Sequence, residues 1–164
     1  MDISTNDQGA VLIEVYFDGL CQPINPGGIA CYAFIVKKEG HPIHSGYGLA
    51  AEPFSKHATN NVAEYMALIK SLEWLLANNL NSDRIEIKSD SQLVVKQLSG
   101  DYKVKAKRII PLYKKVLQLK SEFEDLQIKW VTREQNKEAD GLTNKAYIKT
   151  LQDNPGYLDR SLKD

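Results

Sequence analysis

The chain has 164 residues, and its 21 basic and 21 acidic side chains give a formal net charge of zero at pH 7. This length favours a single domain with a full hydrophobic core, and hydrophobic and charged fractions of 43% and 26% are ordinary for a soluble globular protein. The zero net charge excludes a global electrostatic argument for a nucleic-acid or membrane partner, so such an argument must rest on local clusters.

Neither disulfides nor membrane spans are expected. Cys21 and Cys31 are the only cysteines, too few for a disulfide framework, and they lack the spacing of a metal site. We expect two free, buried thiols in a reducing compartment. No apolar run is long enough to cross a membrane, and the N-terminus lacks the basic and apolar regions of a signal peptide. These observations predict a cytoplasmic protein.

The first half of the domain is predicted to be an antiparallel meander. Residues 1–10 are polar and are expected to form a mobile lead-in to a domain spanning 11–150. Three β-prone segments then follow with short connections between them: 11–17, 29–36 and 42–51. The first is expected to end on Asp18, which precedes a glycine.

The second half alternates helices and strands. A helix is expected to begin near residues 59–61, because Thr and Asn are good N-terminal caps. A strand, two helices, a strand and a last helix follow, at 84–88, 91–99, within 102–121, at 126–131 and from 138. This order predicts an α/β fold whose five-stranded mixed sheet has three antiparallel strands, then parallel strands, and is flanked by helices. Residues 151–164 are expected to form a loosely attached tail.

Asp90 lies where the strand at 84–88 passes into a helix. A carboxylate at that junction sits at the carboxyl end of a sheet, where open α/β folds place their ligands. Asp90 or Ser91 is equally suited to cap the helix that follows, so the junction by itself leaves both roles open.

Three further carboxylates occupy similar junctions. Asp18 closes the first strand, whereas Glu64 and Asp140 are expected in the first turns of helices. Each has an ordinary structural explanation, as a turn residue or as an acid near a helix N-terminus. In a mixed sheet, however, the four can converge, and their repulsion is relieved if a hard cation such as Mg²⁺ or Mn²⁺ binds them. Two such ions form an apparatus for phosphodiester cleavage.

A basic segment stands out in this neutral chain. Residues 102–121 contain no acidic side chain but seven cations. A solvated helix face is one explanation for such a pattern. Tyr102 beside Lys103 and Lys105 favours a surface that contacts phosphates instead.

Several motifs resemble those of the ribonuclease H family, specifically its type 1, archaeal-type members. They occur in the family's order between about residues 11 and 149, at Tyr16 to Cys21 with Asn25 to Gly28, Thr59 to Tyr65, Ser89 to Val94, Tyr102 to Arg108, and Arg133 to Asp140. The resemblance implies an endonuclease that hydrolyses the RNA strand of RNA–DNA hybrids with two Mg²⁺ or Mn²⁺ ions, leaving 5′-phosphate and 3′-hydroxyl ends. It implies four metal ligands, Asp18, Glu64, Asp90 and Asp140.

The same resemblance, together with the basic segment, suggests which residues bind the substrate. Sensing RNA requires contact with its 2′-hydroxyl groups, which amides can provide as donors and acceptors. The spacing between Asp18 and Asn25 is one residue longer than in many relatives. The expected substrate contacts are Asn25, Thr59, Asn60, Asn61, Gln92, Lys103, Lys105 and Asn136.

Two features depart from the pattern of the family. Many relatives carry a histidine in the loop before the last aspartate, where this chain offers Arg133. Because a guanidinium is always protonated, it cannot act as a general base, and Arg133 is assigned to phosphate contact or product release as a fifth catalytic residue. The stretch 102–120 is also too short for the basic handle found in some relatives.

Three alternative functions stay open at this point. The same fold and carboxylates are compatible with cleavage of double-stranded RNA, and a module that binds hybrids without cutting them would keep the groove. A protein that handles a small phosphate compound would need a glycine-rich loop between a strand and a helix, whereas Gly27 and Gly28 precede a strand. A monomer without a membrane partner is expected.

Overall fold

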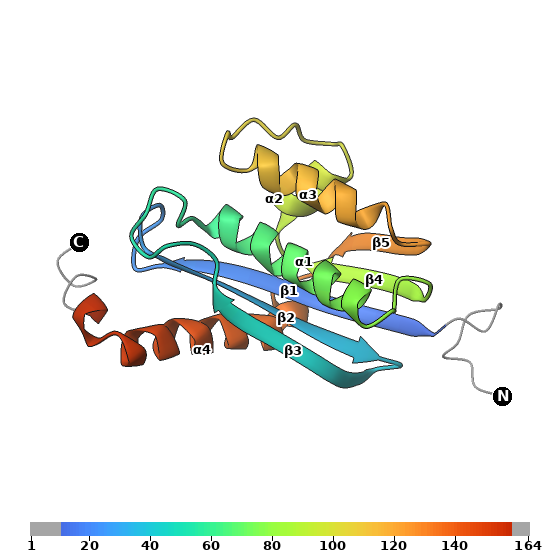
Figure 1. Cartoon of the computed structure of the whole chain (residues 1–164), viewed down its shortest axis with the longest axis horizontal. Coiled ribbons are helices and arrows are strands. Elements are labelled where there is room, and N and C mark those ends of the chain that lie inside the picture. Colours follow the sequence, from blue (N-terminus) through green and yellow to red (C-terminus); the bar gives the residue numbers. More distant parts are fainter. Residues whose placement is uncertain (1–10, 159–164) are drawn as a thin grey trace.

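The computed structural model describes residues 11–158, which form one mixed sheet with the strand order β3-β2-β1-β4-β5 (Figure 1). Strands β1 (Leu12–Gln22), β2 (Ile29–Lys38) and β3 (His41–Leu49) are antiparallel neighbours. Strands β4 (Arg84–Ser89) and β5 (Asp125–Trp130) run parallel to β1. The predicted five-stranded mixed sheet is confirmed.

Helices cover both faces of the sheet (Figure 1). On one face lie α1 (Asn60–Ala77), α2 (Gln92–Leu98) and α3 (Ile110–Lys120). On the other face, α4 (Lys137–Asp153) follows the short 3-10 turn η1 (Glu134–Asn136) and contacts β1, β2 and β3. Among these helices, none has the length and apolar character of a membrane span.

Alternation along the strands builds the main core between the sheet and α1. Ile13, Val15 and Phe17 are fully buried on one face of β1, and Ile85 and Ile87 continue this layer on β4. The helical side supplies residues with helical spacing, namely Tyr65, Leu68, Leu72 and Leu75. The apolar stripe of α1 packs on the centre of the sheet. The first turns of α1 lie against the carboxyl-terminal half of β1, where the backbone of Ala63 approaches Gly19.

Strand β1 is longer than expected and does not end at Asp18. Its antiparallel pairing with β2 continues to Gln22, opposite Ile29, so Asp18 lies inside the strand and pairs with Ala33. Its parallel pairing with β4, by contrast, stops at Tyr16 opposite Lys88. Beyond that point β1 and β4 separate, which leaves a split at the carboxyl end of the two central parallel strands.

The C-terminal segment also differs from the expected loose tail. Helix α4 continues through Asp153, and residues 155–158 form a further helical turn, so the expected boundary at 150 falls inside α4. Leu151 and Tyr157 pack against a second apolar cluster that contains Leu20 and Ile29. The predicted lead-in, residues 1–10, and the last residues, 159–164, lie outside the described part of the chain.

Both cysteines are buried and free, as expected. Cys31 packs in the cluster on the α4 side of the sheet, together with Ala146. Cys21 packs with Ala58 and Ala63 on the α1 side. Because the two thiols lie on opposite faces of the sheet, they are not placed to form a disulfide.

Candidate active site

The split between β1 and β4 brings Asp18 and Asp90 to the same end of the sheet. Asp18 is a β1 residue with only 8% of its surface exposed, and Asp90 follows the last residue of β4 directly. The crevice outside the carboxyl ends of parallel strands is where open α/β sheets place their ligands. Asp90 thus has the strand-end location that the sequence predicts, whereas Asp18 reaches the same crevice from inside β1.

Glu64 reaches this crevice because α1 lies directly on β1. A Cβ atom on Gly19 would come within 2.6 Å of the carbonyl carbon of Ala63, so only glycine permits this approach. Thr59 caps α1 by accepting a 3.0 Å hydrogen bond from the Val62 amide, and the first turn of α1 contains no acidic residue. Glu64 thus lies in the second turn of α1, not in the first as expected. The helix dipole acts mainly on the first turn, so it does not explain an acidic residue at this position.

Ser91, not Asp90, caps the helix that follows β4. The Ser91 hydroxyl oxygen accepts a 3.3 Å hydrogen bond from the Val94 amide, and its O–H donates to the carboxylate of Glu64. This resolves the two roles that the sequence left open at the junction. Asp90 is left to face the crevice, and Ser91 links α2 to the carboxylate from α1.

The four carboxylates act on one another electrostatically. Burial raises the pKa of Asp18 most, followed by the charges of Asp90 and Glu64 and, least, by that of Asp140. The backbone hydrogen bond at Gly19 opposes them, and the resulting pKa is about 8. Burial raises the pKa of Glu64 to about 7, with a smaller raising contribution from Asp90 and a lowering one from the Ser91 hydrogen bond. Asp140 enters from the exposed first turn of α4. The predicted four residues are therefore gathered in one site.

The buried side chain of Asn136 connects β1 to Asp90. Its side-chain amide donates to the carbonyl oxygen of Phe17 at 2.8 Å and to Oδ1 of Asp90 at 2.7 Å, so it bridges β1 and the end of β4. The residue is 1% exposed, and its Oδ1 has no hydrogen-bond partner. In this structure the amide of Asn136 is buried and bonds to Asp90, which makes it a positioning residue, and the expected substrate contact by Asn136 stays a prediction.

Arg133 stands at the opposite extreme of exposure. Its side chain is 92% exposed, and its Nε atom lies 3.9 Å from Oδ2 of Asp90. Trp130 also contacts this aspartate, because its Nε1 donates to the Asp90 carbonyl oxygen at 3.2 Å. Arg133 is thus close enough to reach a group bound at Asp90 and free enough to move with it.

A cavity of about 390 Å³ lies between the start of α1 and the basic segment. Three predicted substrate contacts line it, namely Asn25, Thr59 and Asn61. The amide of Asn60 donates to Oδ1 of Asn25 at 3.1 Å, which joins the two loops that carry these residues. Gln92, another predicted contact, is the exposed first residue of α2.

The cations that line this cavity are not the ones predicted. Lys107 and Arg108 line it, whereas Lys103 and Lys105 are exposed elsewhere on the segment. Nη1 of Arg108 donates to the carbonyl oxygen of Lys56 at 2.8 Å, which draws this part of the segment to the loop before α1. The sequence indicated the acid-free stretch as a whole, and only this long-range contact distinguishes Arg108 and its neighbour Lys107 from the other cations.

The donor set of the crevice fits a hard divalent cation. Within residues 11–158, no group of three or more His, Cys, Asp or Glu side chains is already arranged as a metal-binding set. Burial, and then the charges of the neighbouring carboxylates, nevertheless raise the pKa of Asp18 to about 8, and these groups offer oxygen atoms only. A cation among them would relieve the part of this shift that comes from repulsion.

Known proteins resemble this chain in sequence and in fold. The family model described as "Reverse transcriptase-like" matches residues 33–146. A ribonuclease HI from Halobacterium salinarum is 37% identical over 139 residues, which cover 82% of this chain and 63% of that protein. The chain also spans 24% of a bifunctional protein from Mycobacterium tuberculosis, at 43% identity over 89 residues.

Solved structures extend the comparison over the whole domain. The N-terminal ribonuclease H domain of a M. tuberculosis protein superposes with a TM-score of 0.76 at 31% identity, covering 88% of this chain and 99% of that domain. A ribonuclease H1 isolated from compost, solved in complex with an RNA/DNA hybrid, has a TM-score of 0.75 at 34% identity, with coverages of 85% and 99%. The chain belongs to the ribonuclease H family, in its type 1 branch.

Proposed function

We propose that this protein is an endonuclease that hydrolyses the RNA strand of RNA–DNA hybrids with the help of divalent metal ions. The observation that carries the proposal is the convergence of Asp18, Glu64 and Asp90 at the split between two parallel strands, with Asp140 beside them. Like charges gathered at a ligand-binding edge of the sheet weaken the fold unless they serve a bound cation.

The four carboxylates would hold two Mg²⁺ or Mn²⁺ ions, with Asp18 and Asp90 at the centre of the site. When bound, such ions supply activation of the attacking water and stabilisation of charge on the leaving oxygen, which yields 5′-phosphate and 3′-hydroxyl ends. The chain's own contribution is positional: Asn136 fixes the Asp90 carboxylate, and Ser91 fixes that of Glu64. Arg133 contacts the phosphate or promotes product release from the exposed side of Asp90.

The cavity between the start of α1 and the basic segment fits the backbone of a nucleic-acid duplex. Lys107 and Arg108 offer positive charge to a phosphate, and the amides of Asn25 and Asn61 offer hydrogen bonds to sugar or base edges. The relative solved with an RNA/DNA hybrid supports this choice of substrate class.

The test incubates the protein with end-labelled hybrid, duplex RNA and duplex DNA, each with Mg²⁺, with Mn²⁺ or with EDTA. We expect cleavage of the RNA strand of the hybrid that stops in EDTA and leaves duplex DNA intact. Products are examined for 5′-phosphate and 3′-hydroxyl ends. Cleavage that persists in EDTA, or binding of the hybrid without any turnover, would overturn the proposal. Equal cleavage of duplex RNA would broaden the substrate class.

A further inference from the structure

The loop that precedes α1 contains a residue in an unfavourable backbone conformation. Phe54 has a φ of 65°, a left-handed value that residues with a Cβ rarely adopt. Such a conformation persists only where surrounding contacts enforce it. Two contacts of Phe54 are visible: its amide donates to the carbonyl oxygen of Gly28 at 2.8 Å, and its ring packs edge-on against Tyr157.

The first contact is one of several that join this loop to the loop after β1. The Gly27 amide donates to the Ala58 carbonyl oxygen at 2.9 Å, and the Asn60 amide donates to Oδ1 of Asn25. On the buried side, the Cys21 thiol lies 3.2 Å from the Ala58 carbonyl oxygen. The loops at 22–28 and 52–60 thus form one hydrogen-bonded unit, which supplies Asn25, Pro26 and Thr59 to the wall of the cavity.

The second contact ties this unit to the C-terminal end of the described chain. The rings of Phe54 and Tyr157 have centroids 5.4 Å apart and an interplanar angle of 84°, the edge-to-face geometry that aromatic pairs favour. Both rings belong to the apolar cluster around Leu20 and Ile29, on the α4 side of the sheet. Figure 1 places the end of α4 at the same end of the molecule as these two loops.

We propose that Tyr157 is a positioning residue for substrate binding. It fixes the Phe54 ring, which holds the loop 52–60 in its left-handed turn and so sets the distance between Asn25 and Thr59 across the cavity. The inference rests on the proposed function, because it assigns the cavity to the nucleic-acid backbone. Tyr157 lies on the opposite face of the sheet from α1 and acts only through the loops.

Four variants test this assignment with steady-state kinetics on labelled hybrid. Tyr157→Ala removes the ring, Tyr157→Phe keeps it, and Phe54→Gly removes the partner ring while keeping a residue that adopts positive φ freely. Leu158→Ala is the matched control, because Leu158 is adjacent in sequence and half exposed. We expect Tyr157→Ala and Phe54→Gly to raise KM by up to about tenfold with kcat within about twofold of wild type.

The conservative variant and the control decide the interpretation. Tyr157→Phe and Leu158→Ala should keep the KM of the wild type, and the double variant of Phe54 and Tyr157 should be no worse than either single one, because the two rings act as a unit. A fall in kcat at constant KM, or additive effects in the double variant, would overturn the assignment.

Amide hydrogen exchange tests the same idea without any activity. Tyr157→Ala should speed exchange at the amides of Gly27, Phe54 and Asn60, which make the inter-loop hydrogen bonds, and leave the amides of β4 unchanged. Uniformly faster exchange would reveal a general loss of stability instead and sink the proposal. Failure of the wild type to cut hybrid, with the local exchange pattern intact, would refute the proposed substrate and leave the coupling of Tyr157 to the loops standing.

Discussion

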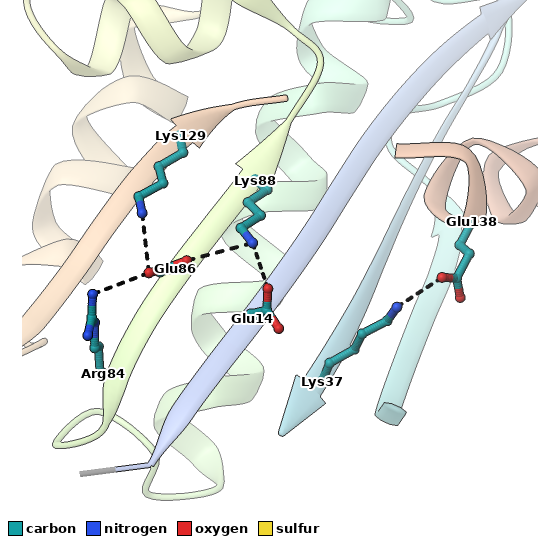
Figure 2. Close-up of polar contacts among 7 residues, drawn as sticks. All are labelled: Glu14, Lys37, Arg84, Glu86, Lys88, Lys129 and Glu138. Atoms are coloured by element: carbon teal, nitrogen blue, oxygen red, sulfur yellow. Dashed lines mark hydrogen bonds and ion pairs between the residues drawn. The ribbon is translucent and has the colours of Figure 1, made fainter. Parts of the chain in front are cut away.

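Two groups of charges lie along the same strands, β1 and β4, and they are built in opposite ways. Figure 2 shows the first, a row of ion pairs across the sheet. The ammonium group of Lys88 lies 2.6 Å from Glu14 and 3.6 Å from Glu86, and Glu86 also pairs with Arg84 at 3.5 Å and with Lys129 at 3.2 Å. Burial lowers the pKa of Lys88, but the hydrogen bond and charge of Glu14 reverse this and raise it overall.

The second group is the carboxylate site, four residues further along each strand. Asp18 follows Glu14 on β1, and Asp90 follows Glu86 at the end of β4. The nearest cation that pairs with this site is Arg133, whose Nε lies 3.9 Å from Asp90 on a side chain that is 92% exposed. In the ion-pair row every carboxylate pairs closely with a cation, whereas among residues 11–158 only Asp90 of the site pairs with one, the distant and exposed Arg133. The first arrangement stabilises the sheet, and the second fits the metal site that we propose.

The most direct test of this comparison neutralises one carboxylate of each group, Asp90 of the site and Glu86 of the ion-pair row. We expect Asp90→Asn to reduce turnover of hybrid by more than the roughly 10–100-fold loss that follows removal of a residue supporting a metal ligand. Glu86→Gln, the matched control, should keep the turnover of the wild type. Steady-state rates with saturating Mg²⁺ measure both, and near-normal turnover by Asp90→Asn would refute the four-carboxylate site.

The buried carboxylates of the site should also make the stability of the fold depend on pH. The pKa of Asp18 is about 8 in the folded chain and 3.8 as its ordinary value, so the folded state holds a proton that the unfolded state has lost. The stability that this proton contributes is fully present below pH 3.8 and is lost as the pH rises through 8. Without metal, the melting temperature should therefore fall across this range, and Asp18→Asn should remove much of the fall.

Metal binding gives the second half of that prediction. Because a divalent cation replaces the lost proton, Mg²⁺ or Mn²⁺ should raise the melting temperature more at pH 8 than at pH 5. The rise should disappear in Asp18→Asn, while Glu14→Gln should retain it. Thermal melts with and without EDTA provide the measurement. An equal effect of the metal at both pH values would mean that Asp18 is not a ligand.

Asn136 supports the carboxylate site with a neutral side chain, because its amide donates a hydrogen bond to the carboxylate of Asp90. Asn136→Asp replaces the donor to Phe17 and Asp90 with a buried acceptor, so it should lower the free energy of unfolding by about 1–3 kcal/mol. Turnover should fall as well, since Asp90 loses its support. Urea unfolding and rates at saturating substrate measure the two effects; unchanged stability would show that the buried bridge does not form in solution.

Arg133 is the next smaller contributor. Arg133→Ala should lower kcat for hybrid more than it weakens binding, because the side chain is exposed near Asp90 and is not among the residues that line the cavity proposed to bind the duplex. Arg133→Lys keeps the charge but loses the planar fork and should recover only part of the rate. Binding is measured by anisotropy in EDTA. A loss of affinity at unchanged turnover would assign Arg133 to the groove instead.

Much of this contrast could be predicted from the sequence, because short motifs place acids next to strand ends and helix starts. The alternation of Arg84 to Lys88 gave the strand before Asp90, and Thr59 gave the start of α1. The end of β1 could not be predicted in this way. Asp-Gly is typical of a turn, and nothing local shows that β2 keeps pairing with β1 as far as Gln22.

Long-range contacts explain the other differences between the expected and the observed positions of individual side chains. Asn136 follows a polar loop and looks available to substrate, yet the split between β1 and β4 buries it. Arg108 is drawn to the carbonyl oxygen of Lys56 by one hydrogen bond, and it lines the cavity together with its neighbour Lys107, whereas Lys103 and Lys105 do not line it. Pairings across dozens of residues leave no local signal, because the partner segments are chosen only when the sheet and helices assemble. The contact between Tyr157 and Phe54 could not be predicted for the same reason, because the C-terminal residues around Tyr157 are mostly polar.

The smallest expected effect concerns the ion-pair row itself. The Glu86 side chain is 12% exposed and contacts three cations, two of which are more than 40% exposed, so water screens part of their attraction. Glu86→Gln should therefore lower the free energy of unfolding by about 1–2 kcal/mol, between the ranges for exposed and buried pairs. Glu134→Gln is the control, because Glu134 pairs with Lys137 at 3.0 Å while 79% exposed and should change stability by less than about 0.5 kcal/mol. Urea unfolding at low and high salt compares them, and equal effects would mean that the row stabilises the sheet no more than an isolated surface pair does.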